Sequence, residues 1–278
     1  MSEIDHEVPV SSAHLTHILS SLSLFEGVPA ERLGALAPIF TARTHERGEQ
    51  LVSAQDPRGR TYLMAAGAAR VSRVSPDGRS IAVALIDAGD VVGRLPFDDA
   101  PGGERVDALE RCTVLRCSAS DFEALLTAEP TVALRVLGSF SRRIRLGGMR
   151  LEGLAFHQVP ARLARVLLDL SDRYGKVTAT GVRVDVRITH GQLAELVATT
   201  RETLTKVAGW LRSENIAALE RRQIWIADYA ALQEVAEGSR IMPGRAQRAS
   251  AAAGDVDHDR AAFGTKVGDR EAVHADDA

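Results

Sequence analysis

Aromatic residues are scarce in this 278-residue sequence: they account for 4% of it, whereas hydrophobic residues make up 45%. The cores are therefore expected to be mainly aliphatic. Long apolar runs are also missing, because the stretches at residues 62–69 and 81–86 are far shorter than the roughly 20 residues of a membrane span. The first residues lack the basic start and apolar stretch of a signal peptide. The expected location is therefore the cytoplasm, with no membrane partner.

Cysteine is nearly absent, since Cys112 and Cys117 are the only two. A four-cysteine iron-sulfur cluster is therefore impossible within one chain. On a strand, this spacing would place the two side chains on opposite faces and about 16 Å apart, which excludes a local disulfide. The sequence also shows no phosphate-binding loop, metal-ligand spacing or nucleophile-base grouping. No cofactor, metal site or catalytic residue is expected, and an enzyme is disfavoured.

Positive charge is not in excess, because the formal net charge is -3. That balance argues against a highly basic nucleic-acid-binding chain. Charge is unevenly distributed along the sequence, however. Residues 159–229 carry eleven Lys or Arg against eight Asp or Glu, so this region is +3 and the remainder is -6. Positive charge is therefore concentrated near the C-terminal motif described below.

Short β-prone runs follow one another between Glu49 and Ser118. They cover residues 50–54, 61–64, 68–74, 80–86, 106–109 and 113–117. Glycines and turn residues between them predict a compact antiparallel barrel or sandwich. Two minor helical elements are expected before these runs, at about residues 20–30 and 31–40.

A heptad pattern begins after Pro130. Its members alternate at steps of four and three: Ala133, Leu137, Phe140, Ile144, Gly147, Leu151 and Leu154. This pattern predicts a helix that pairs with an identical helix, although an amphipathic helix packed inside one subunit would give the same spacing. The arginines near the seam are expected to be solvated: Arg142, Arg143, Arg145 and Arg150. Gly147 and Gly148 should each cost about 1 kcal/mol relative to alanine in mid-helix.

Two adjacent helices are predicted nearer the C-terminus. Thr189 and Gln192 have the spacing of a capping box, which would start the first helix, and Thr199 and Thr200 can cap the second. The second helix has an apolar stripe made of Leu204, Val207, Ala208 and Leu211. Its opposite face carries Arg201, Glu202, Thr205, Lys206 and Gly209.

That opposite face has chemistry suited to reading DNA bases. Arginine can donate two hydrogen bonds to guanine and glutamate can accept from cytosine, both in the major groove, where a helix fits. Residues 216–226 follow as a hairpin with Arg221 and Arg222 at its tip. Such a wing would contact phosphates. Taken alone, Arg201 and Glu202 would be an ordinary solvated pair, but the caps, helix spacing and hairpin together favour base contact.

The stretch from Ile188 to Lys206, ITHGQLAELVATTRETLTK, resembles the helix-turn-helix signature of the cyclic-AMP receptor protein and fumarate-nitrate regulator (Crp/Fnr) family. A less specific likeness extends back through residues 151–156 to Gly67, Gly89 and Gly93. The resemblance implies an α+β fold with an N-terminal cyclic-nucleotide-binding-like β-roll, a long dimerisation helix and a C-terminal winged helix-turn-helix. The expected organisation is a flexible N-terminus (1–19), a sensor roll (20–129), the dimer helix (130–157), the DNA-binding domain (158–238) and a disordered tail (239–278).

The same resemblance implies roles for individual residues. Arg201, Glu202 and Lys206 would read half-site bases, with His190 and Thr200 near phosphates and Thr205 on the same surface. Lysine at position 206, where such proteins often carry arginine, leaves the innermost base preference open, because it lacks arginine's two-pronged geometry. The heptad seam becomes a dimer interface, formed by Leu137, Phe140, Ile144, Leu151 and Leu154. The implied partners are near-palindromic double-stranded DNA, a second copy of the chain, RNA polymerase and an unknown small-molecule effector.

The sensor residues depart from those of relatives that bind cyclic AMP. Those relatives use a Gly-Glu pair, an Arg-Ser pair and a Thr-Ser pair, where this chain has Gly93-Arg94, Arg105-Val106 and Gly147-Gly148. The ribose-binding carboxylate, a phosphate-binding hydroxyl and both base-contacting hydroxyls are missing. The sensor is therefore predicted to be degenerate and not switched by cyclic AMP. Arg94 and Arg105 either hold a different anion or form salt bridges.

Two further comparisons limit the function. Haem-binding relatives use a histidine in the roll, and no histidine lies between Gly93 and Ser118. Haem is therefore disfavoured. A cyclic-nucleotide-type regulatory or interaction protein that does not act on DNA is the alternative function, but it would leave residues 189–226 unexplained.

Overall fold

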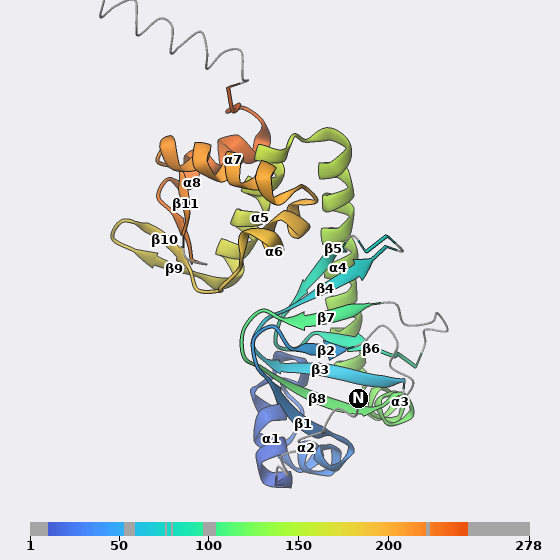
Figure 1. Ribbon diagram of the computed structural model, residues 1–278. Coiled ribbons are helices and arrows are strands. Elements are labelled where there is room, and N and C mark those ends of the chain that lie inside the picture. The colour runs from blue at the N-terminus through green and yellow to red at the C-terminus, as the bar shows by residue number, and fades with distance from the viewer. Residues whose placement is uncertain are drawn as a thin grey trace, which may run out of the picture. The chain divides into compact units, whose positions relative to one another are not determined.

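A computed structural model describes residues 11–52, 59–75, 77–78, 80–96, 104–220 and 223–243 (Figure 1). The described residues up to Ser239 form one compact unit. The tail expected to be disordered (239–278) lies outside the described residues from position 244 onward.

The N-terminal segment is helical from Ser12, which corrects the expectation of a flexible stretch over residues 1–19. Helix α1 (Ser12–Ser21) is capped by Ser11, whose side chain accepts a hydrogen bond from the His14 N–H, and it buries Leu15 and Leu19. The elements that follow are the 3-10 helix η1 (Ser23–Phe25), α2 (Ala30–Leu36) and the 3-10 helix η2 (Ala37–Ile39). Residues 1–10 lie outside the described part of the chain.

The roll consists of two four-stranded sheets in which every strand pair is antiparallel. The first sheet has the order β1 (Thr41–His45), β8 (Cys112–Ser118), β3 (Arg60–Ala66) and β6 (Val91–Gly93). The second has the order β2 (Gln50–Val52), β7 (Arg105–Ala108), β4 (Ala69–Val74) and β5 (Ser80–Ile86). The antiparallel architecture is confirmed, and β1 and β6 are strands that the sequence pattern did not reveal.

Strand β8 separates two hydrophobic clusters. Cys112 packs in the cluster that includes Met64 and Ile86, whereas Cys117 packs in the cluster that joins the roll to the N-terminal helices. The two thiols therefore lie on opposite faces, as the spacing predicted. Burial raises the pKa of Cys112 to about 11 and that of Cys117 to about 12. Both thiols stay protonated at neutral pH and are poor nucleophiles.

Helix α3 (Ala119–Ala128) leads into the long helix α4 (Pro130–Phe156). The side chains of Leu137, Ile144 and Leu151 form one exposed apolar row on α4, with exposed fractions of 64%, 76% and 69%. Phe140 is half-buried and packs against the core shared by the roll and the N-terminal helices. Phe140 is therefore engaged within its own chain, and the exposed seam is narrower than the heptad pattern predicted.

Arg143 and Arg150 attach α4 to the roll, which corrects the expectation that they are solvated, whereas Arg142 is exposed as expected. Arg143 donates to the Val91 carbonyl at 2.9 Å, and Arg150 donates to the Val83 carbonyl at 2.7 Å. Arg142 approaches the buried carboxylate of Asp90 at 3.3 Å. Arg145 is exposed, as expected. Because carbonyls and a carboxylate accept these hydrogen bonds, the orientation of α4 relative to the roll is fixed by charge as well as by packing.

The remaining elements form the winged helix-turn-helix. They are α5 (Val159–Tyr174), β9 (Gly175–Thr178), β10 (Gly181–Val184), α6 (His190–Val197), α7 (Arg201–Ser213), β11 (Ala217–Glu220), β12 (Gln223–Ile226) and α8 (Tyr229–Glu237). The strands form a sheet of order β11-β12-β10-β9. The β11-β12 hairpin was predicted, whereas the β9-β10 hairpin, which extends the wing sheet, was not.

Candidate nucleic-acid interface and sensor site

Local capping starts both helices of the motif where the sequence predicted. The Thr189 side chain accepts from the Gln192 N–H while the Gln192 side chain accepts from the Thr189 N–H, so the capping box is complete. The Thr200 side chain accepts from the Thr203 N–H and caps α7. Between the helices, Ala198 adopts a left-handed conformation with φ of 53°. This turn ends α6 and redirects the chain into α7.

The apolar stripe of α7 is buried, as its spacing predicted. Leu204, Val207, Ala208 and Leu211 are all buried, and Trp210 is buried with them. The stripe fixes the rotation of the helix and so determines which side chains face solvent. The exposed side chains are Arg201, Glu202, Thr205 and Lys206, together with Thr200 at the cap and Gly209.

The exposed face of α7 carries charged groups of both signs. Within the described residues, the side chains of Arg201 and Lys206 make no hydrogen bond or ion pair. The backbone N–H of Glu202 and the Thr200 hydroxyl lower the pKa of the Glu202 carboxyl, and Arg201 and Lys206 lower it further. Glu202 is therefore ionised at neutral pH and acts only as an acceptor. The face offers guanidinium and ammonium donors beside a carboxylate acceptor.

His190 and Thr205 differ from the other expected DNA-contacting residues. The two ring nitrogens of half-buried His190 lie 3.4 Å from the Thr205 hydroxyl and 3.2 Å from the Leu219 carbonyl. His190 therefore links α6 to α7 and to the wing, and its ring is not directed freely at solvent. The Thr205 hydroxyl donates to the Arg201 carbonyl, so it can contribute only as an acceptor. Arg221 and Arg222 lie outside the described residues.

With this geometry established, comparisons with known proteins identify the family. Residues 161–235 match the Crp-like helix-turn-helix domain, and residues 42–129 match the cyclic nucleotide-binding domain. Over 192 residues the chain is 30% identical to the global nitrogen regulator of Synechococcus elongatus, which covers 68% of this chain and 86% of the relative. The chain belongs to the Crp/Fnr family of transcriptional regulators. It is a DNA-binding regulator with a cyclic-nucleotide-binding-like sensor domain, and the family is not enzymatic.

Other Crp/Fnr relatives extend the likeness over most of the chain. It is 28% identical over 214 residues to the CRP-like cAMP-activated global transcriptional regulator of Mycobacterium tuberculosis, covering 74% of this chain and 95% of the relative. The structure of TTHB099, a CRP-family transcriptional regulator from Thermus thermophilus, matches with a TM-score of 0.60 at 26% identity, over 70% of this chain and 96% of that one. FixK2 from Bradyrhizobium japonicum shares the fold, with a TM-score of 0.61 at 20% identity over 71% of this chain and 97% of that one.

The sensor residues of this Crp/Fnr protein lie in different surroundings. Arg105 Nε donates to both carboxylate oxygens of Asp107, at 2.9 and 3.0 Å, so Arg105 forms the salt bridge that was one of its two expected roles. Val106 is fully buried, whereas Arg94 is exposed. A Cβ on Gly93, whose φ is +87°, would lie 2.5 Å from the Arg60 carbonyl oxygen. Glycine is therefore required there by the backbone alone.

Gly147 and Gly148 lie in the middle of α4, where a Cβ on either would meet nothing within 4 Å. Nothing in the described part of the chain explains why these positions are small. Residues 97–103, between β6 and β7 in the sequence, lie outside that part. The described residues also contain no cluster of three metal-ligating side chains and no helix long and apolar enough to cross a membrane.

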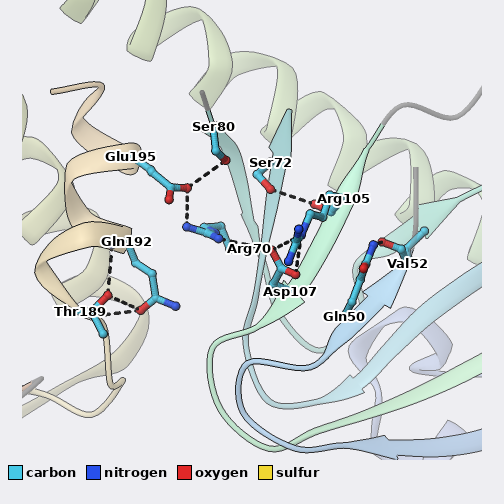
Figure 2. Close-up of polar contacts among 10 residues, drawn as sticks. All are labelled: Gln50, Val52, Arg70, Ser72, Ser80, Arg105, Asp107, Thr189, Gln192 and Glu195. Carbon is cyan, nitrogen blue, oxygen red and sulfur yellow. Dashed lines mark hydrogen bonds and ion pairs between the residues drawn. The ribbon is translucent and has the colours of Figure 1, made fainter. Parts of the chain in front are cut away.

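Sequence reasoning missed an ionic cluster that links the roll to the helix-turn-helix. Figure 2 shows Arg70 of β4 between Asp107 of β7 and Glu195 of α6. One guanidinium nitrogen lies 3.3 Å from the Asp107 carboxylate, and another lies 2.5 Å from that of Glu195. Ser80 also donates to Glu195, at 3.2 Å. Three residues far apart in the sequence form this cluster, so no local pattern could have indicated it.

Proposed function

We propose that this protein is a dimeric, sequence-specific regulator that inserts α7 into the major groove of a near-palindromic operator and is not switched by cyclic AMP. The observation that carries the proposal is the face of α7 opposite its buried stripe. Arg201, Glu202 and Lys206 are exposed together there, and none of them is held in an ion pair with another described residue. Such a face combines the donors and the acceptor needed to distinguish base pairs.

Dimerisation follows from the same proposal. Two recognition helices would engage half-sites about 34 Å apart, one helical turn of DNA. The exposed row of Leu137, Ile144 and Leu151 on α4 supports pairing with a second copy, because a contiguous apolar stripe of this kind is rarely left in water. Thr200, which caps the start of α7, would approach a backbone phosphate, since N–H groups at a helix start attract anions.

Arg201→Ala is expected to weaken binding to the preferred operator by about 1 to 3 kcal/mol and to change binding to random DNA little. The reason is that a base contact is lost only on the correct sequence. Fluorescence anisotropy with an operator found by selection from random sequences would measure both affinities. Arg222→Ala is the control, because a phosphate-contacting arginine should weaken both DNAs alike. Equal losses on both DNAs for Arg201→Ala would remove Arg201 from base reading.

The sensor's composition supports independence from cyclic AMP. At the positions implied by family resemblance, Arg94 offers a donor in place of a carboxylate, Val106 has no hydroxyl and two glycines lack side chains. Arg105, the remaining phosphate-binding candidate, is paired with Asp107. Each unpaired polar group of a buried ligand costs about 1 to 3 kcal/mol. Several such losses would remove micromolar affinity, which corresponds to about 8 kcal/mol in total.

Calorimetry on nucleotide-free protein is therefore expected to show no cyclic AMP binding in the micromolar range. The operator affinity should be the same with and without 1 mM cyclic AMP, an amount chosen as roughly a thousand times a micromolar Kd. The DNA measurement without nucleotide serves as the control, because it shows that the protein is competent. Micromolar binding that also tightens the DNA complex would overturn this part of the proposal.

A further inference from the structure

A cavity of about 130 Å³ lies where the roll, α4 and the helix-turn-helix meet. Its walls are largely apolar, with Ile81 and Ala82 from β5, Leu146 and Met149 from α4, Val166 from α5 and Leu196 from α6. The cyclic-nucleotide-type residues Gly93, Arg94, Arg105 and Val106 take no part in it. An apolar cavity of about 150 Å³ holds a molecule of the size of benzene. This cavity is therefore large enough for a small apolar group.

Three arginines also line the cavity: Arg150 from α4, and Arg162 and Arg165 from α5. Their hydrogen bonds go to backbone carbonyls. Arg150 donates to the Val83 carbonyl at 2.7 Å, and Arg165 donates to the Ala236 carbonyl at 3.0 Å. Arg162 donates to the carbonyls of His157, Val197 and Ala198 at 3.0 to 3.2 Å.

The positive charge of these arginines is balanced only in part, by the attraction of Asp169 for Arg150. Asp169 also lines the cavity, but its carboxylate pairs with Arg173, at 3.1 Å. In the described part of the chain, none of the three arginines forms an ion pair. Burial lowers the pKa of Arg150, the Asp169 carboxylate opposes this shift and Arg173 adds to it, and burial also lowers the pKa of Arg162. Partly buried charge that is incompletely compensated is costly, and an anion in the cavity would relieve that cost.

We propose that this cavity binds a small amphipathic carboxylate, whose charged group meets Arg150, Arg162 and Arg165 and whose apolar body fills the space between α4, α5, α6 and β5. Guanidinium groups suit this ligand because they match the geometry of a carboxylate. The bound molecule would contact the roll, the long helix and the first helix of the DNA-binding motif at once. Its occupancy would therefore stabilise one arrangement of these elements and change the operator affinity.

Benzoate is the probe, because it joins a small apolar ring to a carboxylate that can pair with the arginines. Calorimetry is expected to give a Kd below about 1 mM for benzoate, with at least about tenfold weaker binding of benzyl alcohol and benzylamine. This comparison uses the unaltered protein, so it does not depend on the folding of a variant. Equal binding of the three compounds, or no benzoate binding at 10 mM, about ten times that Kd, would overturn the proposal.

Variants then locate the site. Arg150→Gln should weaken benzoate binding about tenfold or more, because it removes one charged donor. Val166→Phe should abolish it by filling the cavity. Arg145→Gln is the matched control, since Arg145 is exposed on the same helix and does not line the cavity. An equal loss with Arg145→Gln would place the ligand elsewhere. Operator affinity without benzoate is measured separately, so failure of this site is distinguishable from failure of DNA binding.

Discussion

Replacing Ile144 and Leu151 together with glutamate is expected to convert the protein to monomers and to weaken operator binding about 10²- to 10⁴-fold. Both side chains are exposed on α4, at 76% and 69%, and they are spaced by two turns on one face. In a parallel pair of helices, four carboxylates would meet in the apolar seam. Burying unpaired like charges costs more than a seam of this length can supply.

Sedimentation velocity measures the oligomeric state, and anisotropy with the selected operator measures the loss of affinity. Val74→Glu is the control, because this valine is also exposed but lies on β4 of the roll. The control should remain a dimer with unchanged DNA affinity. A dimer in the Ile144 and Leu151 variant would show that the two copies associate through another surface.

The choice of Ile144 and Leu151 for this double substitution depends on the structure as well as on the sequence. The heptad pattern predicted that Phe140 and Ile144 both lie in the dimer seam, but Phe140 packs against the core of its own chain. A glutamate at position 140 would therefore destabilise the roll and confuse loss of folding with loss of dimerisation. A heptad pattern cannot distinguish a residue that faces a second copy from one that faces the core of its own chain. One helix can contact both, through adjacent rows of side chains.

The helix-turn-helix was predictable because its signals are local. Thr189, Gln192 and Thr200 set the helix starts, and the apolar stripe of α7 set its rotation. Helix α1 was missed although Ser11 caps it and Leu15 and Leu19 are one turn apart, a signal that a closer reading of the N-terminus would have found. These are features that neighbouring residues determine.

Other features depend on contacts between distant segments. Strands β1 and β6 are short and acquire their partners from β8 and β3. Arg143 and Arg150 look like surface charges on α4 until the carbonyls of Val91 and Val83 are placed beside them. His190 matches a DNA-contacting position by resemblance, yet its ring contacts the wing carbonyl of Leu219. Contacts between residues so far apart in the sequence leave no periodic pattern from which they could be predicted.

The ionic cluster of Arg70 also depends on contacts between distant segments. Replacing Arg70 should have a large effect on the stability of the protein. Arg70→Met is expected to lower the free energy of unfolding by about 3 kcal/mol, because it leaves the buried carboxylate of Asp107 with less compensation. Urea denaturation followed by circular dichroism measures this loss. Arg73→Met on the same strand is the control, since Arg73 is exposed, and it should change stability by no more than about 0.5 kcal/mol.

A double-mutant cycle then separates the two partners of Arg70. Glu195 is partly exposed, at 28%, so solvent screens its attraction to Arg70 more than it screens that of Asp107, at 8%. The coupling free energy between Arg70→Met and Glu195→Gln is therefore expected to be about 1 kcal/mol, well below the full cost of removing Arg70. A coupling free energy of zero would mean that Arg70 and Glu195 of α6 do not interact in solution. A coupling near 1 kcal/mol would establish a direct energetic link between a strand of the sensor roll and the first helix of the DNA-binding motif.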